Sequence, residues 1–423
     1  MFGLENAQSL VGVAFVIGVC WLLSEDKSRF PWRLTLGAIA VQAGLVLLLF
    51  GFPQSQVVLN GINAGVDGLS SATQRGASFI FDYLAGGDQP YGVEAKDAPF
   101  IFAFRVLPLI LVISALSALL WHWKILKWIT QGFGFLFQKT MGLSGPSALS
   151  VAANIFLGMI ESQIVIRAYL ARLTRSELFL MMVVGLATVA GSTMVAYALI
   201  LKDSLTNAAG HVLVASIISA PAGVLLSRII VPEKDGAGTG RLEPGSELRY
   251  ESSIDALAKG TADGLTVVLS ISAILIVFVA LVALVNVMLS GFWWEGPITV
   301  ERILGYVFAP LAWMIGVPWD EALKGGWLLG VKLALTEFVA YIELGKVADG
   351  ELSERSRMLM TYALCGFANI ASVGITVTGF SVLMPERRSE VIGMVWKALV
   401  AGFLATCLTA SIVGLMPASL FGQ

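Results

Sequence analysis

Long runs of apolar residues, separated by short polar stretches, recur along the whole chain. Seven runs are clear, at about residues 9–23, 34–52, 101–122, 178–201, 211–231, 264–290 and 391–416. About 20 consecutive apolar residues in a helix cross a hydrocarbon core of ~30 Å, so the pattern predicts membrane-spanning helices. Residues 1–8 contain no basic residue and the first run has no clear cleavage site, which favours a retained span over a signal peptide.

Two further stretches, about 127–175 and 300–383, are apolar but interrupted by glycine, proline and charged residues. In each, a glycine-bounded aromatic segment precedes a glutamate, Glu161 in the first and Glu337 in the second. Paired broken segments in two halves of a chain are typical of the midplane site of a transporter. We therefore expect an inverted repeat with two re-entrant helical hairpins, whose irregular backbone is buried in protein and not in lipid.

Basic residues indicate which way the chain enters the membrane, because basic loops stay in the cytoplasm. The loop after the first run holds Lys27, Arg29 and Arg33, which predicts an external N-terminus. The acidic stretch 82–97 is then outside, and the polar stretch 232–262 is a cytoplasmic linker between the halves. The same count predicts an external C-terminus.

Composition agrees with a membrane protein. Of 423 residues, 57% are hydrophobic and 13% are charged, whereas soluble proteins have about 25% charged residues. The net charge of -2 excludes a nucleic-acid partner. Cys20, Cys365 and Cys407 lie in apolar runs, so we expect small buried side chains and not disulfides. With only His122 and His211, a histidine metal site is not expected.

Glu161 and Glu337 are the first candidates for function, because a carboxylate at membrane depth costs several kcal/mol, from about 2.5 upward. The alternative is that each pairs with an arginine or caps a helix. Glu343 is a weaker candidate, because it lies near a hairpin end where it reaches water.

Asn369 and Ser372 are three residues apart, which places them on one helical face. Gly366, Gly374 and Gly379 nearby predict an unwound or kinked span. With the two glutamates, these groups suit a solute with several hydroxyls and amides. The alternative is hydrogen bonding between helices.

Asn154 and Thr188 are candidates for a small cation site, because a hard cation takes oxygen ligands. The run ATVAGSTMVAYA (187–198) around Thr188 is also typical of close helix packing.

Five longer motifs carry a resemblance to a known family. They are ATVAGSTMVAYA (187–198), ILGYVFAPLAWMIGVP (303–318), TEFVAYIEL (336–344), RSRMLMTYALCGFANIASVGI (355–375) and PERRSE (385–390). With them the chain resembles the concentrative nucleoside transporter family, in particular its bacterial, NupC-like, cation-coupled members. The resemblance extends over most of the chain from about residue 100.

The resemblance implies an all-α integral membrane protein with about eight transmembrane helices and two re-entrant hairpins. A scaffold domain would surround an inverted-repeat transport domain, and three copies would form a homotrimer. The expected parts are N-terminal scaffold spans with an interfacial helix (1–98), a first repeat (99–231), the linker (232–262) and a second repeat (263–423). The hairpins are expected around 145–175 and 320–345.

The resemblance also implies roles for individual residues. Glu337, Asn369 and Ser372 would bind the ribose, and Phe367 would line the pocket. The residues of the first hairpin that face the base would be Gly158, Met159, Ile160 and Glu161. A sodium site would use Asn154 and Thr188 with the backbone of Leu157 and Val189.

The first hairpin departs from the family pattern, because GMIESQ stands where GQTEAP is usual. Met159 and Ile160 replace two hydrogen-bonding residues that contact the base, and Gln163 replaces proline. A more apolar contact would relax or shift the choice between purine and pyrimidine. Thr188 stands in place of serine and keeps the hydroxyl, so a sodium site remains expected. A proton is the alternative coupling ion, and Glu161 or Glu337 would carry it.

We therefore predict cation-coupled symport of nucleosides into the cytoplasm by a multi-pass protein of the bacterial inner membrane, without a cofactor. Rival interpretations are a transporter of another small polar metabolite such as a nucleobase, and a non-transporting, nucleoside-gated membrane sensor. An enzyme is not expected, because no nucleophile, metal cluster or phosphate-binding loop accompanies the two glutamates.

Overall fold

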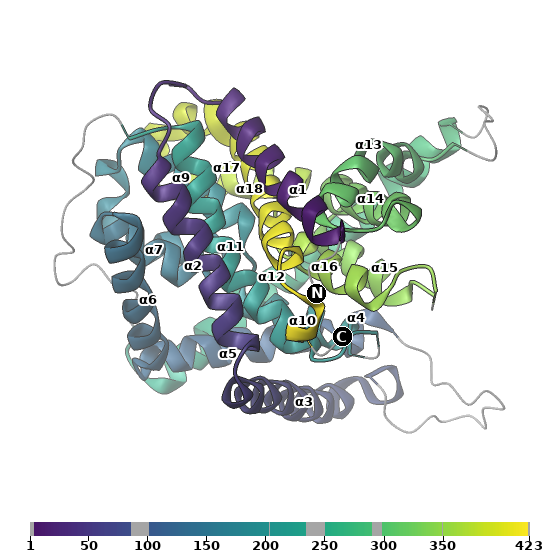
Figure 1. Ribbon diagram of the computed structural model, residues 1–423. Coiled ribbons are helices and arrows are strands. Elements are labelled where there is room, and N and C mark those ends of the chain that lie inside the picture. The colour runs from purple at the N-terminus through teal and green to yellow at the C-terminus, as the bar shows by residue number, and fades with distance from the viewer. Residues whose placement is uncertain are drawn as a thin grey trace.

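The computed structural model describes residues 4–85, 101–202, 204–233, 250–289, 298–348 and 350–421, and this part of the chain is helical (Figure 1). Residues 234–249 of the expected linker lie outside the described residues, and so does the acidic stretch beyond Ala85. The last part of the expected linker is helical, because a long helix begins at Ser253. The first helices are α1 (Leu4–Leu22), α2 (Trp32–Phe50), α3 (Pro53–Phe81), α4 (Phe102–Arg105) and α5 (Leu107–His122). Figure 1 shows α3 lying across the end of the bundle, close to the ends of α2 and α11.

Two sets of helices then follow in the same order. The first set is α6 (Ile125–Met141), α7 (Gly145–Asn154), α8 (Glu161–Ile164) with the 3-10 helix Arg167–Arg172, α9 (Arg175–Ala187), α10 (Gly191–Ile200) and α11 (Ala208–Ile230). The long helix α12 (Ser253–Leu289) leads to the second set, which is α13 (Val300–Ile315), α14 (Trp319–Ala334), α15 (Glu337–Lys346), α16 (Glu354–Leu364), α17 (Ile370–Leu383) and α18 (Arg388–Gly414).

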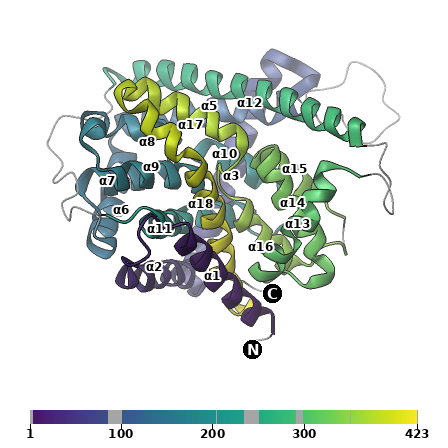
Figure 2. The ribbon, with the colours of Figure 1, turned by 90° about the horizontal axis from the view of Figure 1, so that it is seen from above.

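Each set contains a hairpin, a broken span and a long final helix. The hairpins are α7 with α8, and α14 with α15; the spans break between α9 and α10, and between α16 and α17. Figure 2 shows the two hairpins on opposite sides of the molecule, with α12 crossing beside both sets. The all-helical fold with a re-entrant hairpin agrees with the expectation from the sequence.

Side-chain caps fix where several of the shorter helices begin. Ser144, Thr174, Thr336 and Asn369 accept hydrogen bonds from backbone amides in the first turns of α7, α9, α15 and α17, respectively. Such caps satisfy amide groups that have no partner within a helix. The caps at Thr336 and Asn369 place the start of a helix at the tip of the second hairpin and at the second break.

The span is broken between α16 and α17, as the sequence predicts, but only one of the three glycines lies at the break. Only Gly366 lies in the break between α16 and α17, whereas Gly374 and Gly379 lie inside the continuous helix α17. At Gly379, an added Cβ would lie 2.1 Å from the Ile160 Cδ1 atom. This glycine therefore makes room for the first hairpin and does not unwind the span.

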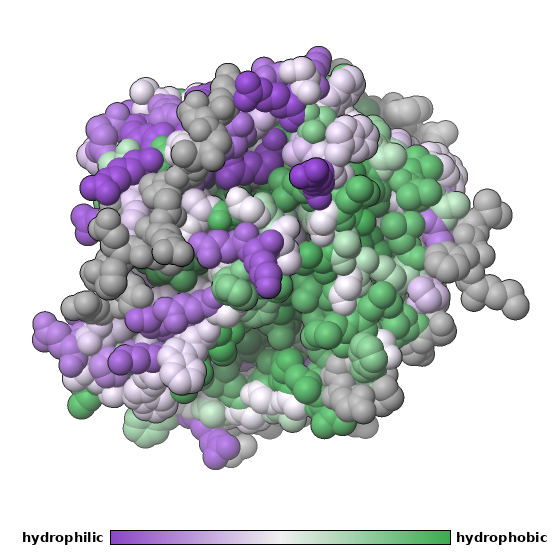
Figure 3. All heavy atoms as spheres, turned by 60° about the vertical axis from the view of Figure 1, so that its left-hand side comes forward, coloured by the Kyte–Doolittle hydropathy of each residue, from purple (hydrophilic) through white to green (hydrophobic). Residues whose placement is uncertain are grey.

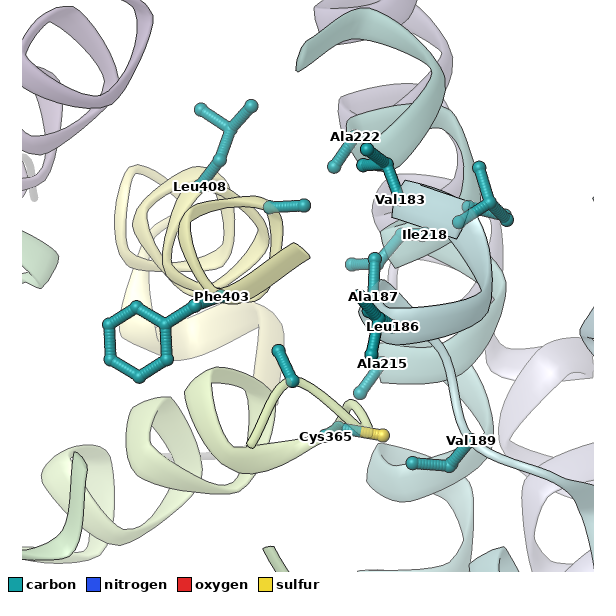
Figure 4. Close-up of a cluster of buried hydrophobic side chains, with 14 of the residues drawn as sticks. Val183, Leu186, Ala187, Val189, Ala215, Ile218, Ala222, Cys365, Phe403 and Leu408 are labelled. Atoms are coloured by element: carbon teal, nitrogen blue, oxygen red, sulfur yellow. The ribbon is translucent and has the colours of Figure 1, made fainter. Parts of the chain in front are cut away.

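The final helices of the two sets pack against α9 in the centre of the molecule (Figure 4). Val183, Leu186, Ile218 and Leu408 are buried there. Small residues bring the backbones close, because an added Cβ at Gly402 would lie 2.7 Å from the Leu186 Cβ atom. This core holds the end of α9, and with it the first break.

The surface fits a lipid environment. Figure 3 shows a face on which hydrophobic side chains form a broad continuous area, bordered by hydrophilic side chains. Within the described residues, α2, Ala103–His122, α9 with α10, α11 and α18 are long and apolar enough to cross a membrane. The helices α13 and α14 form a pair bent by 117°. Cys20, Cys365 and Cys407 are free and buried, as expected.

Candidate solute and cation sites

A cavity of about 490 Å³ lies between the two hairpins. Its walls come from the tips of both hairpins, the first turns of α10 and α17 beyond the two breaks, and the long helices α5 and α12. This volume is in the range of sites for small molecules, about 300–1,000 Å³. The N-terminal ends of α10, α15 and α17 meet at the cavity, and helix N-termini favour groups with negative charge.

Glu337 joins three elements at the cavity. It is 5% exposed and is the first residue of α15. Its Oε1 atom accepts a hydrogen bond from the Tyr197 hydroxyl at 2.9 Å, and its Oε2 atom accepts one from Asn369 Nδ2 at 2.6 Å. A carboxylate has about four acceptor positions, so Glu337 retains acceptor capacity for a solute hydroxyl.

Asn369 and Ser372 lie together for a reason other than a shared helical face. Asn369 has extended backbone angles and caps α17, where its Oδ1 atom accepts from the Ser372 amide at 2.8 Å. The Ser372 side chain lines the cavity, and its hydroxyl has no hydrogen-bond partner among the described residues. The cap therefore orients both the Asn369 amide and a free hydroxyl toward the cavity.

The first hairpin supplies six consecutive residues, Phe156 to Glu161, to the cavity wall, and the four predicted residues Gly158 to Glu161 are among them. Gly158 lies directly under the Glu161 carboxylate, since an added Cβ there would lie 2.0 Å from Oε2. Neither Glu161 nor Glu337 forms an ion pair with an arginine in the described part of the chain. Both glutamates stand in the first turn of a helix, where the helix dipole favours a carboxylate.

Met159 and Ile160 present apolar surface to the cavity and to the neighbouring helices. The Met159 Sδ atom lies 3.7 Å from the Thr376 hydroxyl, and an added Cβ at Gly185 would lie 3.1 Å from the Met159 Cβ. Ile160 packs against Gly379. Phe367 also lines the cavity.

Asn154 and Thr188 are in direct contact, and a third polar side chain joins them. Asn154 Nδ2 donates to Thr188 Oγ1 at 2.9 Å, and Ser162 Oγ donates to Asn154 Oδ1 at 3.1 Å. The Leu157 carbonyl, at the hairpin tip, accepts no hydrogen bond within the described residues. The Val189 carbonyl accepts from Ser216 at 3.4 Å. The side-chain oxygens of Asn154, Thr188 and Ser162 are thus brought together between the first hairpin and the first break.

Several residues of these sites were not predicted from the sequence. Tyr197 lies within a quoted motif, but only the fold brings its hydroxyl to Glu337. Ser162 follows Glu161 directly, and nothing in the sequence indicates its contact with Asn154. The cavity wall on α12 includes Asp263, Thr266 and Ser270. Their spacing places them on one helical face, which was a usable signal.

The α12 wall is held against α5 by small residues. An added Cβ at Gly260 would lie 2.7 Å from the Ala118 Cβ, and one at Gly264 would lie 2.9 Å from the Ser114 Cβ. These glycines are four residues apart, the spacing that lets membrane helices approach closely. The close approach brings Ser114, Ser117 and Trp121 of α5 into the same wall.

Three family models match successive parts of the chain. They are the N-terminus of the Na+ dependent nucleoside transporter (residues 11–84), nucleoside recognition (103–204) and the C-terminus of the Na+ dependent nucleoside transporter (211–414). The chain is similar in sequence to an uncharacterized transporter, YutK, of Bacillus subtilis, with 39% identity over 96% of this chain and 98% of the relative. It is 34% identical to the nucleoside permease NupC of Helicobacter pylori, over 96% of this chain and 97% of that one.

Solved structures of CNTnw have the same fold. An inward-facing, substrate-bound state matches with a TM-score of 0.88 and 35% identity, over 97% of both chains. An outward-facing state of a substituted form matches with a TM-score of 0.90 and 34% identity, over 99% of this chain and 98% of that one. With these relatives along its whole length, the chain belongs to the Na+-dependent, concentrative nucleoside transporter family and is a multi-pass membrane transporter, not an enzyme.

Proposed function

We propose that the protein carries nucleosides into the cytoplasm by symport with sodium, with Glu337, Asn369 and Ser372 holding the ribose. The observation that carries this proposal is the 2.6 Å hydrogen bond between Asn369 and Glu337, beside the free hydroxyl of Ser372. Together these groups offer acceptors and donors to vicinal hydroxyls. Tyr197 holds the other carboxylate oxygen and so keeps Glu337 in position.

The base lies, in this proposal, against Gly158, Met159, Ile160, Glu161 and Phe367. Because Met159 and Ile160 offer no strong hydrogen-bond donors, most of the contact with the base is apolar packing. An apolar subsite discriminates weakly between bases, whereas one built to hydrogen-bond a substrate rejects analogues strongly. We therefore expect both purine and pyrimidine nucleosides to bind.

Sodium binds, in this proposal, between the first hairpin and the first break. The ligands are the Asn154 and Thr188 side chains and the carbonyls of Leu157 and Val189, with the Ser162 hydroxyl as an added oxygen. Neutral oxygens suit a hard cation. No ionisable side chain belongs to this ligand set, which favours sodium over a proton as the coupling ion.

Coupling follows from the position of this cation site. Asn154 and Ser162 belong to the first hairpin, and Thr188 belongs to the first break. The Phe367 amide donates to the Thr188 carbonyl at 3.2 Å, which links the first break to the cavity wall. A cation that orders these groups raises nucleoside affinity, and the nucleoside must raise cation affinity equally.

The larger arrangement is part of the same proposal. A transport domain made of both hairpins and both broken spans moves against a scaffold in a homotrimer. The Asn6 side chain donates to the Gly414 and Met416 carbonyls, so the start of α1 and the end of α18 lie on one side of the molecule. On the opposite side, Glu25, which follows α1, lies 3.5 Å from Lys397 of α18 and pairs with Arg175 at the start of α9. This basic end is the cytoplasmic one, and both termini are external.

Binding of uridine and adenosine to purified protein, measured by titration calorimetry with and without sodium, tests the proposal. We expect both nucleosides to bind, with affinity that rises with sodium concentration. Binding of uracil or adenine without binding of either nucleoside would contradict it.

A further inference from the structure

Lys332 is a buried cation that the proposed transport cycle does not use. It lies on α14, the first arm of the second hairpin, five residues before Glu337, and it is 0% exposed. Its ammonium group forms no ion pair with a carboxylate within the described residues. A buried charge is costly at membrane depth, where such groups pair with one another or with backbone carbonyls and mark function.

The contacts of Lys332 lie at the second break. The Nζ atom donates to the Ala363 carbonyl at 2.8 Å and to Thr406 Oγ1 at 2.7 Å, and lies 5.3 Å from the centre of the Phe403 ring. Ala363 belongs to the last turn of α16, whose carbonyls lack partners within the helix and carry partial negative charge. The ammonium thus lies where the end of a half-helix favours a cation.

The first repeat has a corresponding arrangement. There Asn154, near the end of the first arm of the hairpin, reaches Thr188, directly after the last turn of α9. In both repeats a side chain from the first arm of the hairpin meets the carboxyl end of the half-helix before the break. In the first repeat that side chain is an amide, and in the second it is an ammonium.

The two breaks also touch. An added Cβ at Gly366 would lie 2.8 Å from the Ala187 carbonyl oxygen and 2.6 Å from the Thr406 Cγ2 atom. The Phe367 amide donates to the Thr188 carbonyl. Thr406, which accepts a hydrogen bond from Lys332, is therefore packed close to the proposed sodium site through Gly366. Both breaks support the same cavity wall.

We propose that the Lys332 ammonium is a built-in cation, which takes in the second repeat the place that sodium takes in the first. It neutralises the carboxyl end of α16, ties the second hairpin to α18, and so positions Phe367 and Asn369 for the nucleoside. Lys332 is a positioning residue in this scheme. The scheme rests on the proposed function, because it compares the Lys332 ammonium with the sodium ion proposed for the first repeat.

Replacement of the ammonium tests this inference. Lys332→Met keeps an unbranched side chain, shorter by the terminal nitrogen, and removes the charge and its donors, so we expect nucleoside affinity to fall at least about tenfold. Lys332→Ala removes the atoms of n-propylammonium, so that amine should restore binding at least about fivefold, whereas n-propanol should not. Lys324→Met is the matched control, since Lys324 lies on the same helix but pairs with Glu351 near the surface.

The outcomes separate this inference from the proposed function, because wild-type binding of nucleoside with sodium is measured in the same series. If the wild type does not bind nucleoside in the presence of sodium, the proposed function itself is refuted. With wild-type binding intact, normal affinity in Lys332→Met, or failure of n-propylammonium to exceed n-propanol in Lys332→Ala, would overturn the inference. If neither variant folds, Thr406→Val decides: a severalfold loss of affinity at unchanged melting temperature supports it, and unchanged affinity overturns it.

Discussion

Asn369 Nδ2 and Glu337 Oε2 lie 2.6 Å apart, and this hydrogen bond joins the second break to the tip of the second hairpin. The two residues begin neighbouring half-helices, α17 and α15. Each is held by a further contact, Glu337 by the Tyr197 hydroxyl and Asn369 by the Ser372 amide. The pair is thus preorganised before a solute arrives, which reduces the entropy lost on binding.

Glu337→Gln removes the charge from this pair. Hydrogen bonds to charged groups contribute about 1.5–3 kcal/mol, so we expect nucleoside affinity to fall roughly 10- to 150-fold. Titration calorimetry at saturating sodium measures the change. Glu343→Gln is the control, because Glu343 pairs with Lys346 at the far end of α15 and should bind as the wild type does. Equal affinities in the two variants would contradict the role of Glu337.

Gly158→Ala places a methyl group where the Glu161 carboxylate lies, 2.0 Å from Oε2. The carboxylate must move, so we expect a clear loss of nucleoside affinity. Gly374→Ala on α17 is the control, because an added Cβ there meets no atom within 4 Å. Kd values for uridine and adenosine would show the difference. If Gly158→Ala and Gly374→Ala bind alike, Glu161 does not contact the nucleoside.

Ser162→Ala tests the added oxygen of the cation site. The Ser162 hydroxyl contacts Asn154 Oδ1 and is fully buried. We expect the sodium concentration for half-maximal nucleoside binding to rise severalfold, with nearly unchanged affinity at saturating sodium. A sodium titration of uridine binding measures both values. An unchanged sodium dependence would remove Ser162 from the ligand set.

The double variant Met159→Gln with Ile160→Thr returns hydrogen-bonding groups to the first hairpin. A net hydrogen bond contributes about 0.5–1.5 kcal/mol, so we expect the ratio of uridine to adenosine affinity to change roughly 2- to 10-fold. Competition binding of both nucleosides to each protein measures this ratio. If the ratio does not change, these two positions do not face the base.

The ion pair of Glu25 with Arg175 gives stability that depends on pH. The hydrogen bond from Arg175 holds the pKa of Glu25 below its ordinary value of 4.5. Because the pKa of Glu25 is lower in the folded state, the ion pair contributes its full stability at pH values above the ordinary pKa. This stability is lost as the pH falls through the lowered pKa. We expect the melting temperature of the wild type to exceed that of Glu25→Gln near pH 7, and the difference to narrow at about pH 4. A difference that does not vary with pH would contradict this assignment.

The repeated order of helices could be predicted from the sequence, because apolar runs, interruptions and paired glutamates recur in both halves. The sequence also predicts that Asn369 and Ser372 lie close together, although the physical reason is a helix cap and not a shared face. The Tyr197–Glu337 and Ser162–Asn154 contacts depend on how separate elements pack, which local pattern does not encode. Gly379 was misread for the same reason, since its neighbour Ile160 is distant in sequence.

Concentrative uptake is the most direct test of the central claim that Glu337 binds a nucleoside during sodium-coupled transport. Labelled uridine and adenosine would be supplied to proteoliposomes under an inward sodium gradient or an inward proton gradient, with wild-type protein and Glu337→Gln. The account predicts accumulation of unchanged nucleoside by the wild type under the sodium gradient alone, and its loss in the variant. Accumulation under the proton gradient alone, or equal uptake by the folded variant, would contradict it.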